Sequence, residues 1–260
     1  MNVRSVGLLF KRELQSYFGS LIAYVTITMF LVIAGYFFYN LLATFSVVSF
    51  QAQTNAMLAR QYQLLNINET VVRPLFGNIS IIMLLMTPLL TMRLFSEEKK
   101  TGTIELLLTY PVKDVEVVIS KFLACFVVFL VMILLTVTFP ILLMALGEPE
   151  VMPIITGYLG LILLGAAFVS LGMFTSSLTE NQIVSASICL GVLFFFWLMS
   201  YSAAFVSADF GRVITYLSIN EHIASLAKGV VDTEDVIYYL CFTALFLFLT
   251  LRSLESKRWR

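Results

Sequence analysis

The residues that could do chemistry in this sequence gather between positions 93 and 121, in a charged stretch that separates two long apolar runs. Its first part, Glu97 to Lys100, carries both signs of charge and is predicted to extend the preceding helix into water, where Glu97 can face Lys100 one turn on. Charges at this density are costly inside a bilayer, so the stretch must lie outside the hydrocarbon. The chemistry that it predicts is ionic contact with another surface.

A short amphipathic helix is predicted within the stretch. Gly102 weakens helical structure and permits a change of direction. After it, Ile104, Leu107 and Leu108 fall at i, i+3 and i+4, so they share one apolar face, and Glu105 lies away from them. The segment therefore presents one apolar face and a polar surround.

The helix has a predicted end and a predicted successor. Pro111 disfavours helical geometry at Tyr110, so the helix should stop near Thr109. Asp114 stands where an N-cap belongs, ahead of a helix that enters the next apolar run. The predicted order is helix, bend, short helix, turn, helix.

An ordinary charged loop is the alternative, because cytoplasmic loops are generally rich in Lys and Arg. The order of residue types favours a more specific interpretation. Ser96-Glu97-Glu98, Gly102-Thr103, Glu105-Leu106, Pro111 and Lys121 resemble the segment between the second and third spans of ABC-2 type permeases, most closely that of the gliding-motility type of ABC exporter. In that family the segment contains the coupling helix, which docks into a cleft on a separate ATPase subunit. The resemblance implies these docking residues: Glu97, Glu98, Lys100, Thr103, Ile104, Glu105, Leu107, Leu108 and Tyr110.

Composition places the chain in a membrane. Of its 260 residues, 60% are hydrophobic and only 12% are charged, which is typical of an integral membrane protein. The formal net charge is zero, so the basic face that a nucleic-acid partner requires is not expected. Cys125, Cys189 and Cys241 lie in apolar runs, where a thiol usually behaves as a small hydrophobic side chain.

Six apolar runs are long enough to cross a hydrocarbon core of about 30 Å as helices. We place them near residues 21–42, 74–92, 122–146, 153–175, 183–205 and 236–251. Pro88 and Pro140 lie inside spans and should kink them. Residues 43–72 are expected to form a polar loop with helical pieces, and residues 203–234 short helices at the outer interface.

The first residues predict a helix that lies in the membrane surface. Within residues 1–19, Val6, Phe10 and Leu14 form part of an apolar stripe, whereas Lys11 and Glu13 are expected largely off it. The run Lys11-Arg12-Glu13, followed by Tyr17-Phe18-Gly19, resembles the elbow helix that opens ABC-2 permeases.

Orientation follows from the distribution of Lys and Arg. The side that holds both termini carries three of these residues before the first span, five in the stretch 93–121 and four at the end of the chain, which makes twelve of sixteen. By the positive-inside rule, both termini and the stretch 93–121 are predicted to be cytoplasmic.

Several classes of active protein are disfavoured by what the sequence lacks. No Asp, Glu, Lys, Arg or His lies in any placed span, and an ion-coupled transporter needs ionisable groups at depth. No Walker pattern is present, so we expect no cofactor in this chain. The sole histidine, His222, stands beside Glu221 outside the spans and is expected to be a hydrogen-bonded interfacial residue.

These observations predict an all-α integral membrane protein with one transmembrane domain over residues 1–260. Its six transmembrane helices, N-terminal elbow helix and cytoplasmic coupling helix between spans 2 and 3 match the ABC-2 or type V exporter architecture that the resemblance implies. The implied function is that of a non-catalytic permease subunit in a bacterial cytoplasmic membrane, exporting an unidentified substrate. Two ATPase subunits that bind ATP and Mg, a second permease copy and the lipid bilayer are the implied partners.

Two other classes of function stay open. A membrane scaffold would use the same docking segment to anchor an ATPase that energises a gliding or cell-envelope process, with a periplasmic or envelope partner, and would move no cargo. A secondary transporter would respond to ion gradients without any ATPase, but the missing intramembrane charges disfavour it.

Replacing Leu107 and Leu108 with Asp is expected to abolish co-purification of the ATPase, because two carboxylates on the apolar face would have to be desolvated on docking. Pull-down of the tagged permease from detergent-solubilised membranes measures the effect, and membrane insertion should be unchanged. An intact complex would show that the docking segment lies elsewhere.

Overall fold

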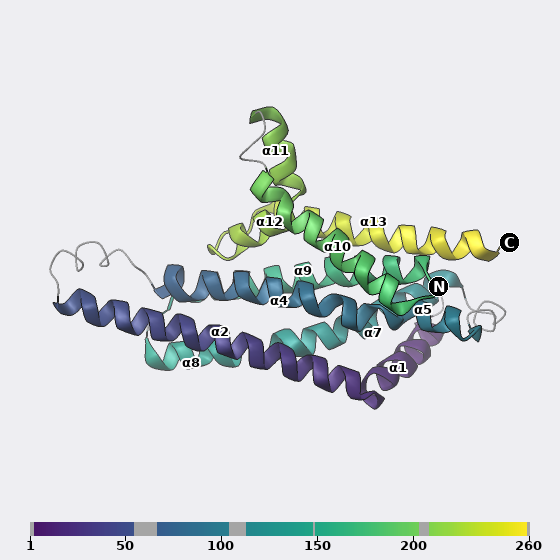
Figure 1. Cartoon of the computed structure of the whole chain (residues 1–260), viewed down its shortest axis with the longest axis horizontal. Helices are drawn as coiled ribbons and strands as arrows, with labels where there is room; N and C mark the ends of the chain where they lie inside the picture. The colour runs from purple at the N-terminus through teal and green to yellow at the C-terminus, as the bar shows by residue number, and fades with distance from the viewer. Residues whose placement is uncertain (1–2, 55–66, 104–112, 148, 203–207, 259–260) are drawn as a thin grey trace.

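The computed structural model describes the chain except for residues 1–2, 55–66, 104–112, 148, 203–207 and 259–260 (Figure 1). Within the described ranges, all regular elements are helices. They are α1 (Val3–Gly19), α2 (Leu21–Thr54), the π-helical η1 (Asn68–Val72), α4 (Arg73–Thr91), α5 (Arg93–Lys100), α7 (Asp114–Leu135), α8 (Thr138–Leu146), α9 (Val151–Leu178), α10 (Gln182–Ser202), α11 (Ala208–Leu217), α12 (Ile219–Leu226) and α13 (Thr233–Arg258).

Six helical stretches in the described part of the chain are long and apolar enough to cross a membrane. They are Leu21–Gln51, Asn68–Lys100, Asp114–Ala145, Val151–Leu178, Gln182–Ser200 and Thr233–Ser256. The predicted all-α fold with six candidate spans is confirmed.

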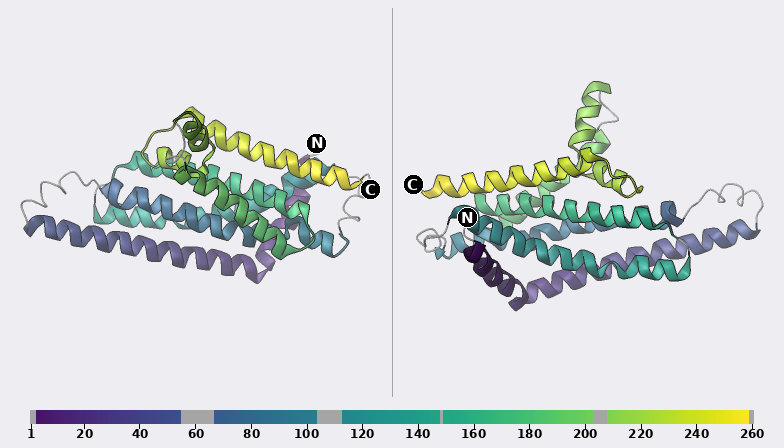
Figure 2. Two further views of the ribbon diagram at one scale, coloured as in Figure 1. Left: turned by 45° about the horizontal axis from the view of Figure 1, so that its top comes forward. Right: turned by 180° about the vertical axis from the view of Figure 1, so that it is seen from behind.

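The long helices lie side by side, with α1, α5 and the end of α13 at one end of the bundle together with both termini (Figures 1 and 2). We call this the termini end. The short helix α12 packs on the bundle near the start of α13, whereas α11 projects away from it (Figures 1 and 2). The amphipathic helix α1 packs mainly across α7 and joins α2 at a sharp angle (Figure 2).

Helix α9 is the centre of the packing and contacts α4, α7, α10, α12 and α13. Two glycines let it approach α4 closely. A Cβ at Gly157 would lie 2.3 Å from the Phe76 ring, and one at Gly172 would lie 2.3 Å from Thr91 Oγ1. Small residues at such crossings are typical of packed membrane helices.

The close pairs keep α4 and α9 in one register. Three contacting pairs have the same separation of 81 positions in the sequence. They are Phe76 with Gly157, Thr91 with Gly172, and Phe95 with its hydrogen-bond partner Ser176. The two helices therefore run parallel with constant register, and the register continues past the turn at Met92 into α5.

Helix α2 differs from the predicted span, which ended near residue 42. It continues to Thr54, because residues 43–50 contain no glycine or proline and remain largely apolar. Its 34 residues correspond to about 51 Å at 1.5 Å per residue, well beyond a hydrocarbon core of about 30 Å. Part of the region predicted as a polar loop is therefore helix, and residues 55–65 of the predicted helical pieces lie outside the described residues.

The third span is broken near Pro140, as predicted. Helix α7 ends at Leu135 and α8 begins at Thr138, with the Phe139 amide donating to Thr136 O at 2.9 Å in the turn between them. At the other end of α7, Asp114 is the first helical residue and Lys113 occupies the N-cap position that we expected for Asp114.

A polar cluster fastens α12 to its neighbours. His222 is buried, with Nδ1 2.6 Å from Asp235 Oδ1 at the start of α13 and Nε2 2.8 Å from Tyr216 O at the end of α11. Thr156 Oγ1 of α9 donates to Leu226 O of α12 at 2.7 Å. Gly229 has φ +91° and turns the chain from α12 toward α13. The expected hydrogen-bonded role fits the position of His222.

Candidate functional site

The candidate site is the junction at the termini end where α5 meets α1, α7, α9 and α13. Helix α5 leaves α4 at Met92 and ends at Lys100. Gly102, with φ +70°, follows in the left-handed conformation that glycine adopts without strain. The predicted bend after the charged run is therefore present.

Ser176, near the end of α9, holds the first turn of α5. The amides of Phe95 and Ser96 donate to Ser176 Oγ at 3.0 and 3.1 Å, and Ser176 Oγ donates to Met92 O at 3.0 Å. Amides in the first turn of a helix lack partners within that helix. Ser176 therefore supplies from α9 the hydrogen bonds that the residue directly before a helix normally supplies as its N-cap; here that residue is Met92, whose side chain makes no cap hydrogen bond.

Lys99 extends this contact to α13. Its Nζ donates to Ser177 O, and Ser253 Oγ of α13 donates to the same carbonyl at 3.2 Å. The prediction that the whole charged run extends into water is wrong for Lys99, whose exposed fraction is only 8%. A lysine stem can cover apolar surface while its ammonium reaches a carbonyl, and this lets Lys99 fold back onto the bundle.

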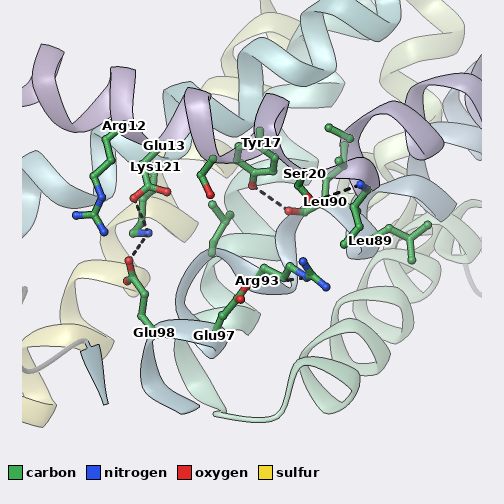
Figure 3. A pocket seen from close by; sticks show the side chains of 14 residues that line it. Arg12, Glu13, Tyr17, Ser20, Leu89, Leu90, Arg93, Glu97, Glu98 and Lys121 are labelled. Carbon is green, nitrogen blue, oxygen red and sulfur yellow. Dashed lines mark hydrogen bonds and ion pairs between the residues drawn. The ribbon is translucent and has the colours of Figure 1, made fainter. Parts of the chain in front are cut away.

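Lys121 of α7 holds the other side of α5. Its Nζ lies 3.0 Å from Glu13 Oε1 of α1 and 2.8 Å from Glu98 Oε1 of α5 (Figure 3), and 5.4 Å from the centre of the Phe95 ring. The Lys121 side chain is 4% exposed. A buried ammonium is tolerated only when paired, so this group ties three helices together.

Tyr17 anchors α1 to the end of α4. Its hydroxyl donates to Leu90 O at 2.9 Å (Figure 3). Burial raises the pKa of Tyr17 well above its ordinary value, so the phenol stays protonated and keeps donating. Together with the Lys121 contacts, this bond fixes α1 against both α4 and α7.

The predicted docking residues divide into three groups. Glu97, Lys100 and Thr103 are exposed, and Glu97 Oε2 lies 4.0 Å from Arg93 Nε, not beside Lys100 as expected. Glu98 is turned inward onto Lys121. The remaining predicted residues lie outside the described part of the chain: Ile104, Glu105, Leu107, Leu108 and Tyr110.

Four residues of the junction were missed from the sequence as contact residues. Glu13 was placed largely off the apolar stripe of α1, yet its side chain is only 14% exposed and faces Lys121. Lys121 was noted only as part of the family pattern, although a lone cation between Val118 and Phe122 signals a buried charge that needs a partner. Ser96 was likewise noted only as part of the family pattern, and Ser176 carried no signal, because serine is common near helix ends.

The junction is built from ion pairs and hydrogen bonds. Among the described residues, no three His, Cys, Asp or Glu side chains gather into a group that could hold a metal ion. The arrangement attaches a short helix with an exposed charged face to α9 and α7, and through Ser177 and Lys121 these contacts are shared with α13 and α1.

Comparison with known proteins adds one finding. The family model described as "ABC-2 family transporter protein" matches residues 8–257, which is nearly the whole chain. No curated protein shows significant similarity to the sequence.

Replacing Lys121 with Met is expected to lower the free energy of unfolding by about 3–5 kcal/mol, because Glu13 and Glu98 would keep their charges in a buried place without a cation. Chemical unfolding of the purified chain in detergent measures the change. The matched control, Lys100→Met at an exposed position of the same junction, should stay within about 0.5 kcal/mol. Adding Glu13→Gln and Glu98→Gln to Lys121→Met should recover part of the lost free energy of unfolding, because the uncompensated carboxylates are removed. Equal losses of unfolding free energy in Lys121→Met and Lys100→Met would contradict the assignment of Lys121 to a buried ion pair.

Proposed function

Because the chain belongs to the ABC-2 family of transporter proteins, we propose that it is the permease through which a separate ATPase drives export of a cargo. Membership of the family supports a multi-pass permease subunit of an ABC transporter and implies an ABC ATPase as partner. The direction of transport, the copy numbers and the coupling route are parts of the proposal.

The attachment of α5 is the observation that carries the proposal. Its exposed residues, Glu97 and Lys100, immediately precede the segment that the sequence predicts as the docking helix. Its buried side is bonded to α9 through Ser176 and to α7 and α1 through Lys121. A push from an ATPase on this segment would reach the spanning helices through these contacts. ATP and Mg are bound by the ATPase, and this chain has no catalytic role.

The excess of Lys and Arg at the termini end supports a cytoplasmic location for that end, where an ATPase has access to ATP. The complete complex in this proposal has two permease copies, identical or similar, and two ATPase subunits beneath them in a bacterial cytoplasmic membrane. The closest functional type in this proposal is the gliding-motility ABC exporter.

A membrane scaffold is the second candidate, and α11 is the observation that favours it. Phe210, Val213 and Tyr216 of α11 are exposed apolar side chains on the segment predicted to lie at the outer surface. An envelope partner could engage them while the ATPase engages the other end. In proteoliposomes, a transporter raises ATP turnover when cargo is added, whereas a scaffold responds to its outer partner.

Replacing Ser176 with Ala is expected to keep the ATPase bound and to lower ATP turnover stimulated by the permease several-fold. The variant leaves the buried Phe95 and Ser96 amides without their cap, a loss of about 1 kcal/mol at the link between α5 and α9. ATP turnover of the reconstituted complex is the measurement. Ser187→Ala is the matched control, since among the described residues the Ser187 hydroxyl bonds only to Ile183 O in its own helix. Unchanged turnover in Ser176→Ala would contradict the proposed route.

Cysteine labelling tests the orientation. In intact cells a membrane-impermeant maleimide should label Lys228→Cys, between α12 and α13, and should leave Lys100→Cys unlabelled until the cells are opened. Both positions are exposed, so access to the reagent decides the result. A background with Cys241→Ala removes the exposed native thiol. The reverse pattern would place the termini end outside and exclude docking of a cytoplasmic ATPase there.

A further inference from the structure

The imidazole ring of His222 lies between oxygen acceptors on two other helices. Its Nδ1 is 2.6 Å from Asp235 Oδ1 of α13, and its Nε2 is 2.8 Å from Tyr216 O of α11. A neutral imidazole has one N–H and can donate to only one of these oxygens. With Asp235 ionised, both contacts are therefore hydrogen bonds only while the ring carries two protons and a positive charge.

The surroundings of the ring favour this charge. Asp235 supplies a buried negative partner, and Tyr216 O belongs to the last turn of α11, where unpaired carbonyls give the helix end a partial negative charge. The Tyr238 ring lies over the imidazole with 4.0 Å between the ring centroids and 24° between the ring planes. An aromatic face in this position attracts a cation. Because burial by itself disfavours a charged imidazole, these three contacts decide whether the ring keeps its second proton.

The ionisable groups that face the ring are Asp235, Tyr216, Tyr238 and Tyr239. Helices α4, α9, α10, α11 and α13 pack on α12, and the sequences of α9 and α10 contain no Asp, Glu, Lys or Arg. In α4 the one charged residue, Arg73, pairs with Glu69. The other ionisable side chains described near this end are bonded elsewhere or exposed to solvent: Tyr158, Asp232, Glu150, Arg212, Glu221, Lys228 and Glu234. Asp235 is therefore the group that controls the charge of the ring.

Two side chains attach the C-terminal end of α11 to its neighbours. His222 Nε2 bonds to Tyr216 O, and the Tyr238 hydroxyl donates to Leu217 O at 2.8 Å. A phenol keeps its proton up to about pH 10, so the histidine bond is the one of the two that changes near neutral pH. When the ring loses one proton, the remaining N–H stays with the carboxylate, which is the stronger acceptor. Nε2 then presents a lone pair to Tyr216 O, and one of the two bonds is lost.

We propose that His222 is a pH-sensitive latch for α11, closed while its ring is charged and opened at Tyr216 when the ring loses a proton. The latch is closed on the acidic side and opens as the pH rises, because only the charged form supplies the second N–H. Helix α11 projects away from the bundle (Figure 1) and exposes Phe210 and Val213, so the latch sets how firmly this apolar surface is held. The inference involves neither an ATPase nor a cargo and stands independently of the proposed function.

Because His222 is the only histidine of the chain, its titration can be observed directly. In the full chain, labelled with nitrogen-15 histidine and purified in detergent, NMR reports the protonation of each ring nitrogen from about pH 5 to about pH 9. Nε2 should lose its proton as the pH rises, and Nδ1 should keep its own. A ring that stays in one protonation state throughout, or that loses the Nδ1 proton first, would overturn the proposal.

A nitroxide label on α11, observed by EPR, measures the attachment. The label is placed at Val213→Cys, an exposed position, in a Cys241→Ala background, and a second chain carries it at the exposed Leu245→Cys of α13. Loss of one charge-assisted hydrogen bond should raise the mobile fraction at Val213→Cys about tenfold, with the same midpoint as the histidine titration. The label at Leu245→Cys should not respond. Mobility at Val213→Cys that does not follow the titration would exclude the latch.

Three variants separate the latch from the other contacts of α11. Asp235→Asn removes the counter-charge and should move both midpoints together to lower pH by about 1 unit or more. His222→Gln has no titrating ring and should abolish the pH response. Tyr238→Phe is the matched control, because it loses the hydroxyl bond to Leu217 O but keeps the stacked ring, so mobility should rise at every pH with the midpoint unchanged. A pH response that persists in His222→Gln, or midpoints that Asp235→Asn leaves in place, would be incompatible with the proposal.

Discussion

Phe95 and Ser96, in the first turn of α5, are fully buried, and their amides take hydrogen-bond partners from another helix. Ser176 of α9 provides them, and the same requirement on the other side of α5 is met by Lys121, whose buried ammonium needs the carboxylates of Glu13 and Glu98. Each contact satisfies a polar group that would otherwise be costly to bury. The position of α5 is therefore determined by electrostatics as much as by packing.

Helix α9 connects this junction to the far part of the molecule. Ser176 bonds to α5 near one end of α9, and Thr156 bonds to Leu226 of α12 near the other. The twenty residues between them correspond to about 30 Å of helix, the thickness of a hydrocarbon core. The cluster around His222 and Asp235 then ties α12 to α13. One continuous helix thus links the proposed ATPase side to the proposed outer segment.

The sequence was sufficient for the helical class, the six candidate spans and the bend at Gly102, because hydropathy, proline and glycine act locally. It was insufficient for the junction. Helical periodicity with a simple polar-out rule assigned Glu13 to solvent, although the position faces α7 and the carboxylate is neutralised there by a residue more than a hundred positions away. The roles of Ser96 and Ser176 depend on the register between α4 and α9, which local patterns do not contain. The predicted span ended near residue 42, whereas α2 continues to Thr54. A helix that lacks a breaking residue does not have to end at the limit of the bilayer.

The matched close approaches between α4 and α9 restrict how these helices can move. The Phe76 ring sits over Gly157 and the Thr91 side chain over Gly172, fifteen residues farther along both helices. A piston stroke of one helix past the other would drive each side chain into the backbone next to its glycine. The two close approaches therefore oppose axial translation of α4 past α9, and the motions they leave open to the pair are tilt and rotation of both helices together.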